Sequence, residues 1–113
     1  MAKLSNEQVR VALKTLSGWK QDGDYITKAF KFGKFMEGIN FVEEVARIAE
    51  EQEHHPDIHI VWTTVTLKIQ THDEGGITEW DVGLAREIEN HFSTGNKTTT
   101  KKKEKKKDKK TRE

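Results

Sequence analysis

The chain has 113 residues, which suits one domain, and its 20 Lys and Arg nearly balance its 19 Asp and Glu at a formal net charge of +1. That total hides two unlike parts: residues 1–96 carry 10 basic and 16 acidic side chains (net −6), and residues 97–113 carry 10 basic and 3 acidic ones (net +7). Cysteine is absent, which excludes disulfides, thiolate zinc ligands and a cysteine nucleophile.

Residues 97–113 read KTTTKKKEKKKDKKTRE and contain no apolar side chain. Such a segment cannot bury enough surface to offset the entropy of ordering, so we predict a folded domain over 1–96 and a disordered Lys-rich tail over 97–113. Because the domain itself is acidic, any weak contact with nucleic acid is expected from the tail, where it would be non-specific and salt-dependent. A tail that only aids solubility is the alternative.

The first ten residues, MAKLSNEQVR, lack the apolar stretch of a signal peptide, and no apolar run approaches the length of a membrane span. We therefore expect a cytoplasmic protein without membrane contact.

The first predicted element is a helix that starts after Ser5, which forms a capping-box pattern with Gln8, and ends at Gly18. A hairpin follows, with its turn at Asp22-Gly23. The two elements place their apolar side chains on one face each: Val9, Ala12, Leu13 and Leu16 in the helix, and Ile26, Phe30 and Phe32 in the second strand.

Residues 34–53 read as the longest helix, stopped by Pro56, which also pushes His55 towards extended backbone. Its apolar arc is wide: Phe35, Ile39, Val42, Ala46 and Ala49 follow helical spacing, with Phe41, Val45 and Ile48 beside them. Two interpretations stay open, a helix lying deep on a sheet and a helix that also contacts another subunit.

Two more strands are predicted, at 57–62 and 63–72, and in the second of them Val65, Leu67 and Ile69 share one face. A turn at DEGG leads to a last helix capped by Thr78, with Leu84, Ile88 and Phe92 on its apolar face. The expected fold is therefore α+β, in the order α-β-β-α-β-β-α, with an antiparallel sheet whose apolar face carries the helices.

Four of the five histidines, His54, His55, His59 and His72, lie in the second half of the domain, and His91 is expected to end the last helix in a structural role. In an antiparallel pair the start of one strand lies near the end of its partner, so we predict that His54 and His55 are neighbours of His72. A single histidine is more often a surface or capping residue, but a set in one neighbourhood indicates a site.

Three kinds of chemistry are conceivable for this set of histidines. A zinc site needs three or four ligands in tetrahedral geometry, and the spacings do not supply them clearly. A serine or cysteine hydrolase has no supporting motif. Metal-free general acid–base catalysis suits imidazoles, which titrate near neutrality, with Glu50, Glu53, Asp73 and Asp81 close enough in sequence to orient them.

A longer pattern joins these residues: Glu50, three residues, His54-His55-Pro56, five residues, Trp62, nine residues, His72, eight residues, and Asp81. This pattern resembles the signature of the pterin-4a-carbinolamine dehydratases. The segments LSGW, FKFGKFMEGINFVEEVA and THDEGGITEWD are also similar to the family, so that the resemblance covers roughly residues 4–92.

The resemblance implies three helices on one face of a four-stranded antiparallel sheet, and an enzyme that removes water from a 4a-hydroxy-tetrahydropterin without metal or organic cofactor. It implies a catalytic set of His54, His55 and His72, with Glu50 and Asp81 as orienting carboxylates and Pro56 as the residue that fixes the backbone. The substrate pocket would be lined by Glu53, His54, His55, Gln70, Thr71, His72 and Asp73.

The resemblance also implies aromatic positions at Trp19 and Trp62, either bordering the pterin or packing in the core. Trp80 departs from it, since an exposed and often charged residue is expected there. Homodimers or homotetramers through the long helix are implied as well. Family members in animals are also dimerisation partners of a homeodomain transcription factor, so a dimerisation or coactivator module acting through the long helix is the alternative function.

Overall fold

The computed structural model describes residues 2–98, with side chains up to Phe92, and confirms the predicted order of elements. The elements are α1 (Asn6–Leu13), β1 (Lys20–Asp22), β2 (Tyr25–Lys31), α2 (Phe35–Gln52), β3 (Asp57–Val61), β4 (Thr64–Ile69), the short 3₁₀ helix η1 (His72–Glu74) and α3 (Glu79–Thr98).

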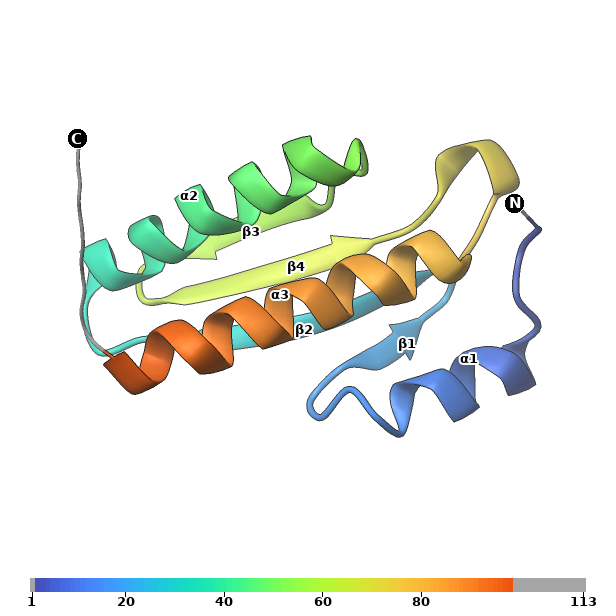
Figure 1. Ribbon diagram of the computed structural model, residues 1–113, viewed down its shortest axis with the longest axis horizontal. Coiled ribbons are helices and arrows are strands. Elements are labelled where there is room, and N and C mark those ends of the chain that lie inside the picture. Colours follow the sequence, from blue (N-terminus) through green and yellow to red (C-terminus); the bar gives the residue numbers. More distant parts are fainter. Residues whose placement is uncertain (1, 99–113) are drawn as a thin grey trace.

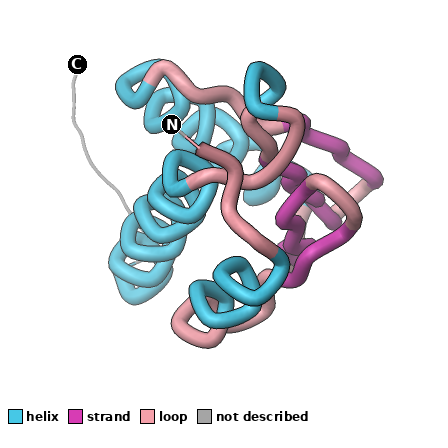
Figure 2. Tube along the Cα trace, turned by 90° about the vertical axis from the view of Figure 1, so that its right-hand side faces the viewer, coloured by secondary structure: helices cyan, strands magenta, loops and turns pink. Residues whose placement is uncertain are grey.

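The four strands form one antiparallel sheet in the order β1-β2-β4-β3, which confirms the predicted fold class. All three α-helices lie on one side of this sheet, while its other side faces outward (Figures 1 and 2). Short turns join β1 to β2 and β3 to β4, which explains the antiparallel pairing within each of these two hairpins.

The core lies between the sheet and the helices. Strand β4 occupies the middle of it, because Val65, Leu67 and Ile69 alternate onto the helical face and are fully buried. Four phenylalanine rings from β2, α2, α3 and the β2–α2 connection pack against each other at one end of this layer, namely Phe30, Phe32, Phe41 and Phe92.

Helix α1 is capped by Ser5 and Gln8 as predicted, but it ends at Leu13 and not at Gly18. The chain continues in tight turns, in which Leu16 donates to the Leu13 carbonyl and Trp19 donates to the Leu16 carbonyl. Gly18, at φ +88°, provides the left-handed residue that turns the chain into β1.

The apolar arc of α2 divides into a buried and an open part. The buried residues are Gly38, Phe41, Val45, Ile48 and Ala49. The residues that follow helical spacing in the sequence lie mostly at the border of the buried face: Phe35 and Ala46 are exposed, and Ile39 and Val42 are half-buried. The cause is position: α2 lies over the β3 edge of the sheet, so only the arc facing β4 and α3 is covered (Figure 1).

Lys28 lies on the helical face of β2, between Ile26 and Phe30. Its ammonium is 2.6 Å from a carboxylate oxygen of Glu89 on α3, and the indole N–H of Trp19 donates to the same oxygen at 2.9 Å. These partners satisfy a charge that would otherwise be costly at the edge of the core. Trp19 is thus a buried packing residue.

Helix α3 continues to Thr98, two residues beyond the predicted domain boundary, and its buried face of Leu84 and Ile88 is as predicted. His91 therefore does not end the helix; it pairs instead with Glu44 of α2 at 2.9 Å. The remaining tail residues, 99–113, lie outside the described residues, so the Lys-rich tail stays a prediction. Within residues 2–98, no helix is long and apolar enough to cross a membrane.

Replacing Leu67 by alanine should lower the free energy of unfolding by about 2–5 kcal/mol, because the cavity would open in the middle strand of the sheet, where neighbours cannot easily collapse into it. Urea denaturation measures the loss. Val61→Ala is the control, since that side chain is 73% exposed and its removal should change stability by no more than about 0.5 kcal/mol. Equal losses in the two variants would contradict this account of the core.

Candidate active site

The predicted site residues gather at one end of the molecule, where α2 ends, β3 begins, β4 ends and α3 begins (Figure 1). We call it the histidine end, after His54, His55 and His72. The opposite end, at the β3–β4 turn of Trp62 and Thr63, is called the turn end. Extending the β3–β4 register from Asp57 and Lys68 by three residues pairs position 54 with position 71, which explains why these segments meet.

The end of α2 fixes the backbone of His54. Glu53 adopts the left-handed conformation (φ 54°), and the His54 N–H donates to the Ala49 carbonyl at 3.1 Å. This is the Schellman arrangement, which usually has glycine in the place of Glu53. Glu53, predicted to line the pocket, therefore also shapes the backbone that presents His54, and Pro56 follows shortly as a residue that cannot continue a helix.

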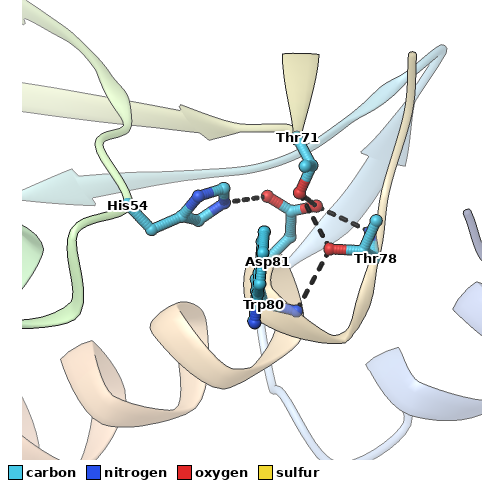
Figure 3. A network of polar contacts seen from close by, with 5 residues as sticks. All are labelled: His54, Thr71, Thr78, Trp80 and Asp81. Atoms are coloured by element: carbon cyan, nitrogen blue, oxygen red, sulfur yellow. Dashed lines mark hydrogen bonds and ion pairs between the residues drawn. The ribbon is translucent and has the colours of Figure 1, made fainter. Parts of the chain in front are cut away.

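A buried carboxylate holds the ring of His54. The Nε2 atom lies 2.6 Å from Oδ1 of Asp81, whose side chain is fully buried, while the His54 side chain is 13% exposed (Figure 3). The other Asp81 oxygen, Oδ2, accepts from the Thr71 hydroxyl at 2.9 Å and from the Thr78 N–H at 2.7 Å. The prediction that Asp81 orients a histidine agrees with this contact.

Thr78 has a larger part in this network than the helix cap predicted for it. Its hydroxyl accepts from the Trp80 N–H at 3.2 Å and contacts the Thr71 hydroxyl at 2.8 Å. Asp81 thus satisfies the backbone N–H of Thr78, and the Thr78 hydroxyl satisfies that of Trp80, at the start of α3. The spacing Thr-x-x-Asp is visible in the sequence, from which Thr78 was predicted only as the helix cap.

The hydrogen bond to Asp81 determines which ring nitrogen of His54 remains available to a ligand. A carboxylate with no proton only accepts, so Nε2 must be the ring atom that donates and Nδ1 is the one without a proton in the neutral ring. Within the described part of the chain, Nδ1 forms no hydrogen bond. His54 therefore offers a fixed ring with one nitrogen free for a ligand.

The other two histidines of the predicted set are exposed. His55 pairs with Glu50, as predicted, with Nε2 2.6 Å from Oε2, and both side chains are more than half exposed. His72 begins η1, directly after buried Thr71, and among residues 2–98 its side chain has no hydrogen-bonding partner. The three histidines lie at the same end of the sheet, although none of their rings is in direct contact within the described residues.

The remaining predicted residues differ in exposure. Asp73 is exposed and Gln70 is half-buried, both next to the Thr71–His72 pair. His59 is exposed on β3, where it pairs in register with Thr66. Trp62 is 76% exposed at the turn end, so it does not border the histidines, whereas the ring of Trp80 lies 6.1 Å from that of His54.

Two hollows of the described part, of about 820 and 340 Å³, lie beside α1, and no histidine lines either of them. Among residues 2–98, no group of three or more His, Asp or Glu side chains is arranged to hold a metal ion. The expectation of catalysis without a cofactor stays a prediction.

A fixed imidazole on a buried aspartate, with two further histidines at the same end of an α+β sheet, is the arrangement expected of an acid–base catalyst. The family model for pterin 4 alpha carbinolamine dehydratase matches residues 2–91. The chain therefore belongs to the pterin-4a-carbinolamine dehydratase family.

Individual relatives agree with this assignment. A protein of Mycolicibacterium smegmatis, with the provisional name pterin-4-alpha-carbinolamine dehydratase, is 50% identical over 93 residues, which cover 82% of this chain and 99% of the relative. A Mycobacterium tuberculosis protein with the same provisional name is 49% identical over 92 residues, covering 81% and 98%. A solved structure from Brucella melitensis, described as a transcriptional coactivator/pterin dehydratase, has a TM-score of 0.74 at 32% identity, covering 78% and 96%.

Replacing Thr71 by valine should reduce the free energy of unfolding by about 1–3 kcal/mol, because the near-isosteric side chain leaves buried Asp81 without one donor. Thermal or urea denaturation measures the change. Thr66→Val on β4, the strand that leads to Thr71, is the matched control, since Thr66 is half-exposed and should change stability by no more than about 0.5 kcal/mol. If both variants match the wild type, the hydroxyl does not support the carboxylate as described.

Proposed function

We propose that the protein is a dehydratase that converts 4a-hydroxy-tetrahydropterin to quinonoid dihydropterin and water, regenerating the cofactor of aromatic amino acid hydroxylases. The observation that carries the proposal is the His54–Asp81 contact, with a free Nδ1 on a ring held in place. Family membership supports the pterin as substrate. The fold also brings His72 to the same end of the sheet as His54 and His55.

The reaction requires two proton movements. The bond between C4a and the hydroxyl oxygen breaks, a proton is delivered to that leaving oxygen, and a proton is removed from a ring nitrogen, so that the products are the quinonoid ring and one water. Histidines serve both steps near neutral pH, because one ring donates while another accepts.

The different environments of the histidines support different roles. His54 is fixed and partly buried, which suits binding and polarising the pterin through Nδ1. His55 and His72 are exposed and exchange protons readily with water, which suits the transfers at the C4a hydroxyl and at the ring nitrogen. The contact with Glu50 orients the ring of His55.

Stopped-flow measurement of carbinolamine dehydration after treatment with a chelator tests this proposal. Wild type should accelerate dehydration over buffer, and the double substitution His55→Ala with His72→Ala should reduce the rate by about 10²-fold or more, as expected for lost proton transfers. His59→Ala is the control, because that exposed histidine lies on β3 away from the proposed proton transfers and should leave the rate unchanged. A wild-type rate no better than buffer would refute the dehydratase proposal.

A second candidate function, assembly through α2, rests on a different observation. The exposed fractions of Phe35 and Met36 are 47% and 57%, and the half-buried Ile39 and Val42 continue this apolar row along the helix. Such a row favours contact with another chain. We propose that it forms the subunit contact of a homodimer or homotetramer, or the surface of a dimerisation or coactivator module.

Substituting Phe35 and Ala46 by lysine should shift the protein to the mass of a single chain in sedimentation velocity, because two charges would have to be desolvated in the contact. Val11→Lys on α1 is the control, since Val11 is also an exposed apolar residue (52%) but lies outside this row. A mass that responds to neither variant, or equally to both, would contradict assembly through α2.

A further inference from the structure

Trp80 is an exposed aromatic residue that the helix holds beside the anchored histidine. Its exposed fraction is 53%, and its ring lies 6.1 Å from the His54 ring at an angle of 57° (Figure 3). No other aromatic ring contacts His54 within the described residues. An indole left half in water beside the anchored imidazole is available to a ligand that contacts that imidazole.

The first turn of α3 fixes the position of Trp80. Its backbone N–H donates to the Thr78 hydroxyl at 3.2 Å, and its neighbour Asp81 is tied to Thr71, Thr78 and His54. Successive helix residues point about 100° apart, so Asp81 enters the core while Trp80 stays at the surface. The network that anchors His54 therefore also sets the distance between the two rings.

We propose that Trp80 determines recognition of the pterin by providing a stacking surface for its pyrimidinone ring, beside the ring of His54. This inference rests on the proposed function and deepens it. A planar heteroaromatic ring stacks well on indole, which offers a large rigid surface at a small entropy cost. His54 alone would hold one edge of the ligand, whereas His54 and Trp80 together define both an edge and a face.

Stacking of this kind acts on binding more than on chemistry. The pyrimidinone half of the bicycle stays close to flat before and after water leaves, apart from C4a, which carries the hydroxyl, while C6 and C7 are saturated throughout. An indole contact with the pyrimidinone half therefore stabilises substrate and transition state by similar amounts. Removal of the contact should therefore raise KM and leave kcat nearly unchanged.

Calorimetric titration with a stable 7,8-dihydropterin, which lacks the 4a-hydroxyl, tests the inference without turnover. Trp80→Ala should weaken Kd by about 5- to 150-fold, the range that corresponds to loss of one stacked ring. Trp80→Phe should recover most of the affinity, because the benzyl ring still offers a face. Trp62→Ala is the matched control, since Trp62 is even more exposed but lies at the turn end, and it should bind as wild type does.

Steady-state dehydration rates with the same variants complete the test. An increased KM and a kcat within about threefold are expected for Trp80→Ala. Wild type that binds and dehydrates the pterin, with a Trp80→Ala variant of equal Kd and KM, would overturn the inference and leave the dehydratase proposal standing. A change in sedimentation mass without a change in Kd would assign Trp80 to a subunit contact and also overturn it. Wild type that neither binds nor dehydrates the pterin would overturn both.

Discussion

The Asp81 carboxylate is the interaction on which the histidine end depends. It is fully buried, and a buried charge is tolerated only when donors surround it. The donors come from three segments far apart in sequence: the α2–β3 connection supplies His54, the end of β4 supplies Thr71, and the start of α3 supplies the Thr78 N–H. One side chain thereby closes the end of the sheet, caps a helix and orients an imidazole.

The histidines at this end differ in how firmly they are held and in how exposed they are to water. The ring with the buried partner, His54, is held by both its backbone, through the end of α2, and its side chain. His55 and His72 extend from the same strand ends into solvent. The proposed acid–base reaction needs a fixed group that positions the substrate and groups that regain their protons from water between turnovers, and the two environments at this end match these two needs.

The sequence was sufficient for most of the fold because local patterns and global packing agree. Strict alternation in β4 and the capping signals at Ser5 and Thr78 were confirmed. The residue at which α1 ends and the set of α2 residues that are buried were less predictable, since both depend on which other elements pack against these helices. The network around Asp81 required the fold itself: spacing indicates that Asp81 orients a histidine, but only the β3–β4 register brings His54 opposite Thr71.

Exposed large apolar side chains of this protein lie at two different ends of the sheet. Phe35 and Met36 lie at the start of α2, and Trp62 lies in the β3–β4 turn; the backbone bond from Phe32 to Thr63 brings these segments together at the turn end. Trp80 lies at the other end, fixed to the network of Asp81. Surfaces at opposite ends of the sheet can be changed independently, so the proposed subunit association and the proposed pterin recognition can be tested separately. An exposed tryptophan next to the histidines therefore points to a ligand, whereas the apolar row on α2 points to another chain.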